Sequence, residues 1–398
     1  MFKYREIDDL DLSGKKVIVR ADLNIPVIDG VISDLSRLEK LAPTIKKLSQ
    51  RGARVVIISH FGRPNGEVNN DYSLNVVIPA LKNILEQDVV FSAECIGHQA
   101  EKIVNSLAPS EVVVLENLRF YKGEEDNDSE FARRLALLGD IYINDAFSVS
   151  HRFHASIDKL PKLLINAAGP QVIEEIKNLS RLFDNKPGLV VAVIGGSKVS
   201  TKVSVLKNLI KKVDYLIIGG AMANTFLYEK GMNLGLSIYE TQFNDVIGSI
   251  LSKAKQENCE IILPVDLVVA NNLRNPQNIS TCLVDSIPND RMALDIGEDS
   301  LSFYISILKK CKAILWNGPL GAFEFEPFGN GTTGFAKEIA RLTNNGKITS
   351  IAGGGDTIAA LNQASVTSEF TYASTAGGAF LEWVEGKDLP GIIALDKL

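Results

Sequence analysis

The chain contains 398 residues, of which 45% are hydrophobic and 23% are charged. Because single hydrophobic cores stop growing well below this length, we expect two domains of about 150–200 residues each. The composition excludes intrinsic disorder, collagen and a coiled coil. A net charge of −6 argues against a nucleic-acid partner, since nucleic-acid-binding proteins present a broad basic face.

No stretch approaches about 18 uninterrupted apolar residues, the length that spans a bilayer, so no membrane partner is expected. The first residues, Met1–Glu6, lack the apolar segment and small-residue cleavage site of a secretory signal. The four cysteines lie far apart and form no Cys-x-x-Cys pair. We therefore expect reduced cysteines and a cytoplasmic protein.

Short β-branched runs alternate along the chain with segments whose apolar residues have helical spacing. In the first half, strands are predicted at 17–19, 55–58, 112–115 and 141–143, and helices at 35–48, 76–85 and 131–138. In the second half, strands are predicted at 189–194, 215–218, 313–316 and 348–352, and helices at 203–210, 221–228, 335–342 and 357–361. This alternation predicts an α/β fold with two doubly wound parallel-sheet (Rossmann-like) domains.

A charged segment with helical apolar spacing, Val172–Phe183, lies between Gly169-Pro170 and Pro187-Gly188. We predict a linking helix over 171–185, an N-terminal domain over 1–170 and a C-terminal domain over 186–385. The apolar tail 386–398 is expected to pack back on the N-terminal domain, although it could instead cover its own domain. The hinge is expected at the linking helix and at Ser374–Gly378.

In open α/β sheets, ligands bind beyond the carboxyl ends of the strands. Each predicted strand of the first half is followed by arginine, in the segments Arg20–Pro26, Ser59–Pro64, Glu116–Phe120 and Asn144–Arg152. Their convergence at one sheet edge predicts a pocket for phosphate or carboxylate. For a single segment, an ordinary salt-bridged turn remains an alternative. His151 and His154 have no carboxylate at helical spacing and are not expected to bind metal.

Glycines follow the predicted strands of the second half, in the segments Gly195–Lys202, Gly219–Ala221, Asn317–Glu324 and Gly353–Thr357. Glycine lets a ligand approach the backbone, and the helix start that follows offers free N–H groups to an anion. In the last segment, Asp356 can face Mg²⁺ and Thr357 stands at a helix start. Tight strand-to-helix packing could explain one such segment alone.

Two common nucleotide-binding motifs do not apply. The chain has no Gly-x-x-x-x-Gly-Lys-Ser/Thr sequence, so it is not a P-loop enzyme. Its one Gly-x-Gly-x-x-Gly sequence, Gly329–Gly334, follows no predicted strand, and we predict a loop there. No Gly-x-Ser-x-Gly sequence marks a nucleophilic serine.

The motifs at the strand ends, taken in this order, resemble those of phosphoglycerate kinase along essentially the whole chain. The segments that carry the resemblance are Val19–Pro26, Ser59–Pro64, Glu116–Phe120, Gly195–Lys202, Trp316–Glu324 and Gly353–Thr357. The resemblance implies 3-phosphoglycerate binding by Asp22, Asn24, Arg37, His60, Arg63, Arg119 and Arg152. It implies Mg-ATP binding by Gly196, Lys198, Lys202, Gly220, Asn317, Glu324, Gly354, Gly355, Asp356 and Thr357, with Asp356 as the Mg²⁺ ligand.

Four residues depart from the pattern of the family, namely Ile25, Ser148, Thr201 and Ala376. None of these departures removes a side chain expected to contact a ligand. Ala376 interrupts a glycine triplet, and its Cβ restricts the backbone where a phosphoryl group or a hinge would need freedom.

The implied reaction is reversible, in-line phosphoryl transfer between 1,3-bisphosphoglycerate and ADP, giving 3-phosphoglycerate and ATP, in glycolysis. The resemblance also implies that the protein is a monomer and that transfer follows hinge closure. The attacking carboxylate is already ionised at neutral pH, so no catalytic base is needed, and His60 is expected to donate a hydrogen bond. Positioning and positive charge suffice. We expect Arg37, Lys202 and the amides of Gly355 and Gly378 to act on the transferring group.

Two other functions remain as alternatives. Two doubly wound domains would suit an NAD-dependent dehydrogenase, but no strand-to-helix turn carries its glycine motif. A two-domain protein that only binds a small anion would need the arginine pocket but not the lysines and the Asp-Thr pair of the second half. Nicotinamide difference spectra would reveal the first, and 3-phosphoglycerate-dependent ADP formation would exclude the second.

Overall fold

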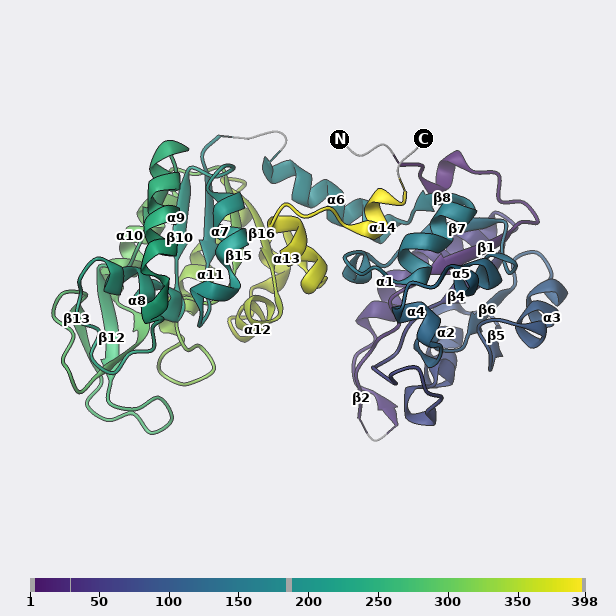
Figure 1. The fold of residues 1–398 in the computed structure, drawn as a ribbon, viewed down its shortest axis with the longest axis horizontal. Coiled ribbons are helices and arrows are strands. Elements are labelled where there is room, and N and C mark those ends of the chain that lie inside the picture. Colours follow the sequence, from purple (N-terminus) through teal and green to yellow (C-terminus); the bar gives the residue numbers. More distant parts are fainter. Residues whose placement is uncertain (1–3, 29, 184–187, 396–398) are drawn as a thin grey trace. The chain divides into compact units, whose positions relative to one another are not determined.

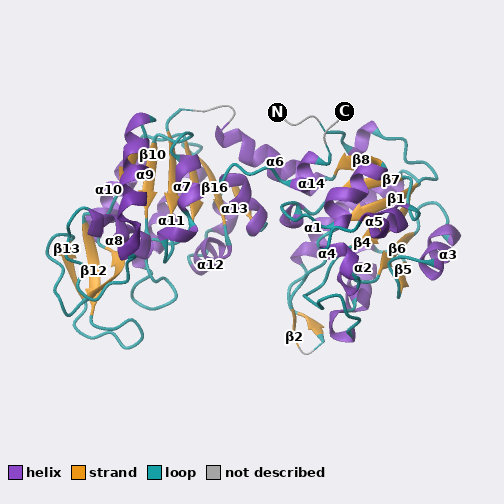
Figure 2. Ribbon diagram, viewed as in Figure 1, coloured by secondary structure: helices purple, strands orange, loops and turns teal. Residues whose placement is uncertain are grey.

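The computed structural model describes residues 4–28, 30–183 and 188–395, which form two compact units. Unit 1 comprises Met1–Ile176 with Asp388–Leu398, and unit 2 comprises Lys177–Lys387. Each unit contains a six-stranded parallel sheet with helices around it, so the predicted α/β fold class is confirmed (Figures 1 and 2). Residues 184 and 185 of the predicted linking helix, and residues 396–398 of the predicted tail, lie outside the described residues.

The sheet of unit 1 has the strand order β5-β6-β4-β1-β7-β8, with all neighbours parallel. Its strands are β1 (Lys16–Arg20), β4 (Arg54–Ile58), β5 (Val89–Ser92), β6 (Val112–Leu115), β7 (Ile141–Asn144) and β8 (Ile165–Ala168). Every residue of β6 and β7 is buried, which explains why these strands are continuous apolar runs without alternation.

Helices and one hairpin surround this sheet. The helices are α1 (Ser36–Gln50), α2 (Ile78–Leu85), α3 (His98–Ser106), α4 (Lys122–Glu125), α5 (Ser129–Ala136) and α14 (Pro390–Ile393). The hairpin consists of β2 (Val27–Ile28) and β3 (Val31–Ile32). Two short 3-10 turns follow strands, η4 (Leu118–Phe120) after β6 and η5 (Phe147–Val149) after β7. These turns carry residues of the site described below.

Helix α6 (Pro170–Phe183) begins one residue before the predicted start at 171, and the division between the units falls within it, after Ile176. Asp145, just after β7, accepts hydrogen bonds from the Gln171 backbone N at 2.8 Å and from Thr44 Oγ1 at 2.6 Å. The buried Asp145 carboxylate therefore connects the start of α6 to α1 and to the end of β7.

The C-terminal segment Asp388–Leu398 belongs to unit 1. The backbone N of Gly391 donates to the Ser150 carbonyl at 2.9 Å, and Asn144 Nδ2 donates to the Gly391 carbonyl at 3.1 Å. Leu389, Ile392 and Leu395 are each 1% exposed, so this segment contributes apolar side chains to a buried environment.

The main sheet of unit 2 has the order β11-β10-β9-β15-β16-β17, again with all neighbours parallel. Its strands are β9 (Val190–Ile194), β10 (Tyr215–Ile218), β11 (Glu260–Ile262), β15 (Ala313–Asn317), β16 (Thr349–Gly353) and β17 (Tyr372–Ser374). A second, antiparallel sheet has the order β13-β12-β14, formed by Ser280–Leu283, Asp266–Ala270 and Met292–Ile296. The sequence reading did not predict this smaller sheet.

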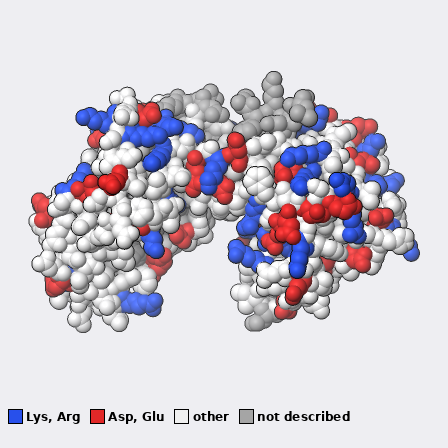
Figure 3. Space-filling model, viewed as in Figure 1, with Lys and Arg blue, Asp and Glu red and all other residues white. Residues whose placement is uncertain are grey.

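The helices of unit 2 are α7 (Val203–Leu209), α8 (Gly220–Glu229), α9 (Asn244–Gln256), α10 (Glu298–Leu308), α11 (Asn330–Asn344), α12 (Gly355–Gln363) and α13 (Gly378–Val384). Lys207 lies in the last turn of α7, and Lys253 and Lys255 lie in the last turn of α9. Cations there complement the negative end of the helix dipole. Figure 3 shows lysine and arginine gathered on one part of the surface of unit 2. No helix within the described residues is long and apolar enough to cross a bilayer.

The loop predicted over Gly329–Gly334 is wrong, because Asn330–Gly334 form the first turn of α11. Asp295 Oδ2 accepts a hydrogen bond from the Gly331 backbone N at 2.8 Å, and Thr332 Oγ1 accepts one from the Leu320 backbone N at 3.0 Å. Both contacts come from distant parts of the chain, so the local glycine-rich sequence gave no sign of this helix start.

Candidate active site

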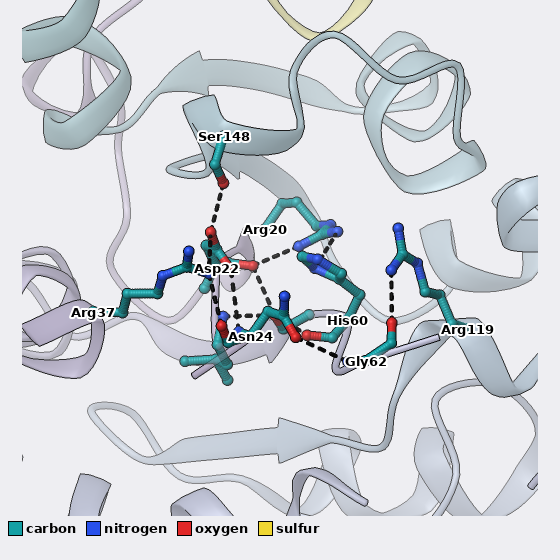
Figure 4. Close-up of polar contacts among 11 residues, drawn as sticks. Arg20, Asp22, Asn24, Arg37, His60, Gly62, Arg119 and Ser148 are labelled. Atoms are coloured by element: carbon teal, nitrogen blue, oxygen red, sulfur yellow. Dashed lines mark hydrogen bonds and ion pairs between the residues drawn. The ribbon is translucent and has the colours of Figure 1, made fainter. Parts of the chain in front are cut away.

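The carboxyl edge of the unit 1 sheet brings together five of the predicted acceptor-site residues, namely Asp22, Asn24, Arg37, His60 and Arg119 (Figure 4). Arg20 is the last residue of β1, His60 follows β4, and Arg119 lies in η4 after β6. Arg37 reaches the same edge from the first turn of α1. Parallel strands end at one edge, which explains this convergence of residues separated by up to 99 positions.

Asp22 is the centre of one group of polar contacts in Figure 4. Arg37 Nη1 lies 2.8 Å from each carboxylate oxygen of Asp22 and also donates to the Asn24 carbonyl at 2.8 Å. The Asn24 backbone N donates to Asp22 Oδ1 at 3.1 Å, and Ser148 Oγ donates to Asp22 Oδ2 at 2.6 Å. Asp22 therefore joins the loop after β1 to α1 and η5.

Arg20 is fully buried, and its charge lies close to a buried carboxylate. Arg20 Nε donates to Ser156 Oγ at 3.0 Å, and Ser156 Oγ donates to Glu124 Oε1 at 2.6 Å. Burial lowers the pKa of Arg20 and raises that of Glu124, while the attraction between the two groups opposes both shifts. Arg20 Nη2 also lies 3.3 Å from His60 Nδ1.

The pKa of His60 lies well below its usual range, first because the ring is buried and second because Arg20, Arg119 and Arg152 are nearby. His60 is therefore a neutral imidazole at physiological pH. Because Arg20 can only donate, Nδ1 of His60 accepts, and the ring proton lies on Nε2. This Nε2–H is available to donate a hydrogen bond to an anion.

We expect NMR spectra to show His60 as the neutral Nε2–H tautomer at neutral pH and still at pH 6.5, the usual midpoint of an imidazole. Protonation would put a fourth positive charge among three arginines, so it should occur only well below pH 6.5 and should then destabilise the folded state. A pH titration of the imidazole nitrogens measures this directly. A His60 midpoint near 6.5 would contradict the proposed electrostatics. The loss of these imidazole signals in His60→Gln would confirm their assignment.

Asn117 fixes the positions of two loops at this edge. Its Oδ1 accepts from the backbone N of Phe61 at 3.1 Å and of Arg119 at 3.0 Å. Its Nδ2 donates to the carbonyls of Phe61 at 2.7 Å and Tyr72 at 2.9 Å. Arg119 is 3% exposed and donates through Nη1 to the Gly62 carbonyl at 2.7 Å. Asn117 was not predicted as a site residue, although it lies in the segment Glu116–Phe120, one of those that resemble the family.

The loop that carries Arg63 requires glycine at position 62. Gly62 has a φ of +59°, and an added Cβ would lie 2.2 Å from the ring of Tyr72. Arg63 is exposed and lines a pocket of about 550 Å³ together with Asn65, Asn69 and Tyr72. Arg63 therefore faces solvent, in contrast to the buried Arg119.

In unit 2, a pocket of about 330 Å³ lies at the carboxyl edge of the main sheet. It is lined by four of the predicted nucleotide-binding residues, Gly196, Gly220, Glu324 and Asp356. Apolar side chains of Leu267, Met292 and Leu320 also line it. Gly220 has a φ of +63°, and a Cβ there would lie 2.8 Å from the Gly196 carbonyl oxygen. The backbones of the two glycine segments therefore lie so close together at this point that position 220 needs glycine.

Lys202 and Asn317 form the polar part of this edge. Lys202 Nζ donates to Asn317 Oδ1 at 2.6 Å, and Asn317 Nδ2 donates to the Gly353 carbonyl at 2.7 Å. Thr357 Oγ1 accepts from the Gly318 backbone N at 2.7 Å, which ties α12 to the loop after β15. Burial lowers the pKa of Lys202, whereas the carboxylates of Glu385 and Asp356 raise it.

The other predicted residues take separate positions in unit 2. Lys198 and Asp356 are exposed, and Asp356 and Gly355 lie in the first turn of α12. Gly378 opens α13. Ala376 is buried, and its backbone N donates to Ser374 Oγ at 3.2 Å. The Cβ at position 376 is accommodated without a positive φ.

Asp295 also lines this pocket of unit 2 and was not predicted. Its carboxyl group is 3% exposed, and burial raises its pKa to about 7. Gly321 and Gly331 leave the space that this group occupies, since a Cβ at Gly321 would lie 2.2 Å from Asp295 Oδ1. A single aspartate in a strand gives no sequence signal of such contacts.

The geometry agrees with what comparisons with known proteins find. The family model described as phosphoglycerate kinase matches residues 7–387. The chain belongs to the phosphoglycerate kinase family. A phosphoglycerate kinase of Rhizobium meliloti (strain 1021) is 48% identical over 393 residues, covering 98% of each chain, and one of Chelativorans sp. (strain BNC1) is 47% identical over the full length of both.

Solved structures of phosphoglycerate kinases have the same fold. The structure from Coxiella burnetii is 38% identical with a TM-score of 0.92, covering 99% of each chain. That from Pyrococcus horikoshii OT3 is 30% identical with a TM-score of 0.80, covering 99% of this chain and 98% of the other. The predicted family, fold class and activity are therefore confirmed: the chain is a glycolytic kinase, a phosphotransferase with a carboxyl group as acceptor.

Proposed function

We propose that the carboxyl edge of the unit 1 sheet binds 3-phosphoglycerate or 1,3-bisphosphoglycerate. The observation that carries this assignment is the buried His60 imidazole, whose Nδ1 lies 3.3 Å from Arg20 Nη2 and which has Arg119 and Arg152 nearby. Such a site attracts anions, and the His60 ring offers them a neutral hydrogen-bond donor. The acceptor carboxylate is already ionised at neutral pH, so the reaction needs no catalytic base. The acceptor contacts are assigned to Asp22, Asn24, Arg37, His60, Arg63, Arg119 and Arg152.

The pocket of unit 2 is assigned to ATP or ADP with Mg²⁺. Its apolar walls suit a nucleobase, and the first turn of α12 offers backbone N–H groups to the phosphates. Asp356 fits a Mg²⁺ ion because its carboxylate is exposed in that turn, and Mg²⁺ in kinases is held by one or two carboxylates plus phosphate oxygens. When bound, the ion supplies positive charge to the phosphate oxygens.

Positive charge from both units is proposed to act on the transferring phosphoryl group. Its loose transition state spreads negative charge over the equatorial oxygens. Arg37 from unit 1 and Lys202 from unit 2 would stabilise this charge, together with the amides of Gly355 and Gly378. Without substrate, Asp22 holds Arg37 at the sheet edge of unit 1, and Asn317 holds Lys202 at the sheet edge of unit 2.

Because the two substrates are assigned to different units, transfer requires the units to close on each other. The chain passes between the units within α6, after Ile176, and again after Lys387. The hinge is proposed at α6 and at Ser374–Gly378, which precedes α13 and the second of these crossings. Closure would also exclude the water that could otherwise accept the phosphoryl group. A cytoplasmic monomer is proposed as well. The cysteines support the cytoplasm, since all four are described and none forms a disulfide.

A coupled assay for ADP formation from Mg-ATP tests the reaction directly. We expect ADP to form only when 3-phosphoglycerate is present. Binding of both ligands without ADP formation would contradict the assignment of the two sites.

Replacing Asp356 by asparagine is expected to weaken Mg-ADP binding by about 10–100-fold, because the neutral amide is a poorer ligand for Mg²⁺. Binding of 3-phosphoglycerate should change little, since it is assigned to unit 1. Calorimetry with each ligand measures both effects. An equal loss of both affinities would contradict the assignment of the two ligands to separate units. Asp299→Asn, at an exposed carboxylate in the first turn of α10, is the control.

A further inference from the structure

Ser148 lies in η5, directly after β7, and is partly exposed. Its Oγ donates to Asp22 Oδ2 at 2.6 Å, from above in Figure 4, whereas Arg37 approaches Asp22 from the left. Asp22 also accepts from Arg37 Nη1 and from the Asn24 backbone N. Ser148 thus adds a short hydrogen bond to a carboxylate whose main charge partner is an arginine.

The backbone around Ser148 is held firmly in place. Phe147 and Val149 on either side are 3% and 4% exposed. The Ala146 backbone N donates to Asn144 Oδ1 at 3.1 Å, and Ser150 Oγ donates to the Ala146 carbonyl at 3.1 Å. Ser148 therefore presents its hydroxyl from a fixed position, which is a favourable arrangement for orienting another side chain.

Arg37 differs from Ser148 because its side chain is long and 36% exposed, so the guanidinium group has room to move. If Arg37 moves to an anionic substrate, Asp22 loses its cation while 15% of its side chain faces solvent. The donors that remain on Asp22 are Ser148 and the Asn24 backbone. Hydrogen bonds to an ionised acceptor strengthen when its counter-charge leaves, so Ser148 lowers the cost of releasing Arg37.

We propose that Ser148 is a positioning residue that keeps the Asp22 carboxylate oriented when Arg37 leaves it for the substrate. This role rests on the proposed acceptor site of unit 1. Ser148 acts through Asp22 and need not touch the substrate. Its contribution should appear at the step in which Arg37 is released and should depend on the charge of Asp22.

Ser148→Ala is expected to lower kcat/KM for 3-phosphoglycerate by about 3–10-fold. This loss corresponds to part of the free energy that a hydrogen bond to a charged group contributes. The KM for ATP should remain unchanged. Ser148→Thr keeps the hydroxyl and should restore most of the rate. Ser286 makes the same type of contact elsewhere, donating to Asp285 Oδ1 at 2.7 Å, so Ser286→Ala is the matched control.

A double-mutant cycle separates this role from a general structural one. Ser148→Ala should have no further effect in the Asp22→Asn background, because the neutral amide removes the charge through which Ser148 acts. Wild-type kinetics in Ser148→Ala, or its full effect added to that of Asp22→Asn, would overturn the proposal while the acceptor site stands. If Asp22→Asn itself is fully active, the assigned acceptor site fails and the role of Ser148 fails with it.

Discussion

Arg37→Ala is expected to lower kcat by about 10³–10⁵-fold, as does the loss of other arginines that contact a transferring phosphoryl group. The dissociation constant of 3-phosphoglycerate should change far less, because the interaction is made mainly in the transition state. Arg37 suits this role because it reaches the site from α1 and is held by Asp22, whereas Arg20 and Arg119 are buried at strand ends.

Steady-state kinetics together with calorimetry would measure the two effects of Arg37→Ala separately. Arg133→Ala is a suitable control in the same unit, since Arg133 pairs with Glu130 on the exposed side of α5. Unchanged kcat with weakened 3-phosphoglycerate binding would assign Arg37 to substrate anchoring and refute its transition-state role.

Lys202→Ala is expected to lower kcat by about 10²–10³-fold, the usual cost of removing a preorganised donor from developing negative charge. Lys202 is preorganised because its Nζ is held by Asn317 Oδ1 at 2.6 Å. Although burial lowers its pKa, the Glu385 and Asp356 carboxylates oppose this shift and favour the ammonium form.

The control for Lys202→Ala is Lys211→Ala. Lys202 directly precedes α7, and Lys211 is an exposed lysine shortly after the end of that helix. Single-turnover measurements at saturating Mg-ATP would isolate the chemical step from nucleotide binding. A variant with a normal single-turnover rate and only a raised KM for ATP would contradict the proposed role of Lys202.

The sequence predicted the four central strands of each parallel sheet, because buried strands such as β6 and β10 are short apolar runs with recognisable ends. It did not predict the edge strands β5, β8, β11 and β17. It also predicted which residues follow those ends, and parallel topology then brought Arg20, His60 and Arg119 together. These predictions needed only local patterns and the rule that ligands bind beyond strand ends.

The sequence did not predict contacts that depend on distant segments. Asn117 bonds to Phe61 and Tyr72, which lie 56 and 45 residues away. Asp295 fixes the start of α11 across 36 residues, and the loop predicted there was wrong for that reason. Ser148 stood out only as a departure from a family pattern, and its bond to Asp22 became visible once β1 and β7 were neighbours.

Small-angle X-ray scattering tests most directly the central claim that each unit holds one substrate and that transfer requires both. The radius of gyration is expected to remain unchanged with 3-phosphoglycerate alone or Mg-ADP alone and to fall when both are present. Asp356→Asn should need a higher Mg-ADP concentration for the same compaction. Full compaction with Mg-ADP alone, or no compaction with both ligands bound, would contradict this account.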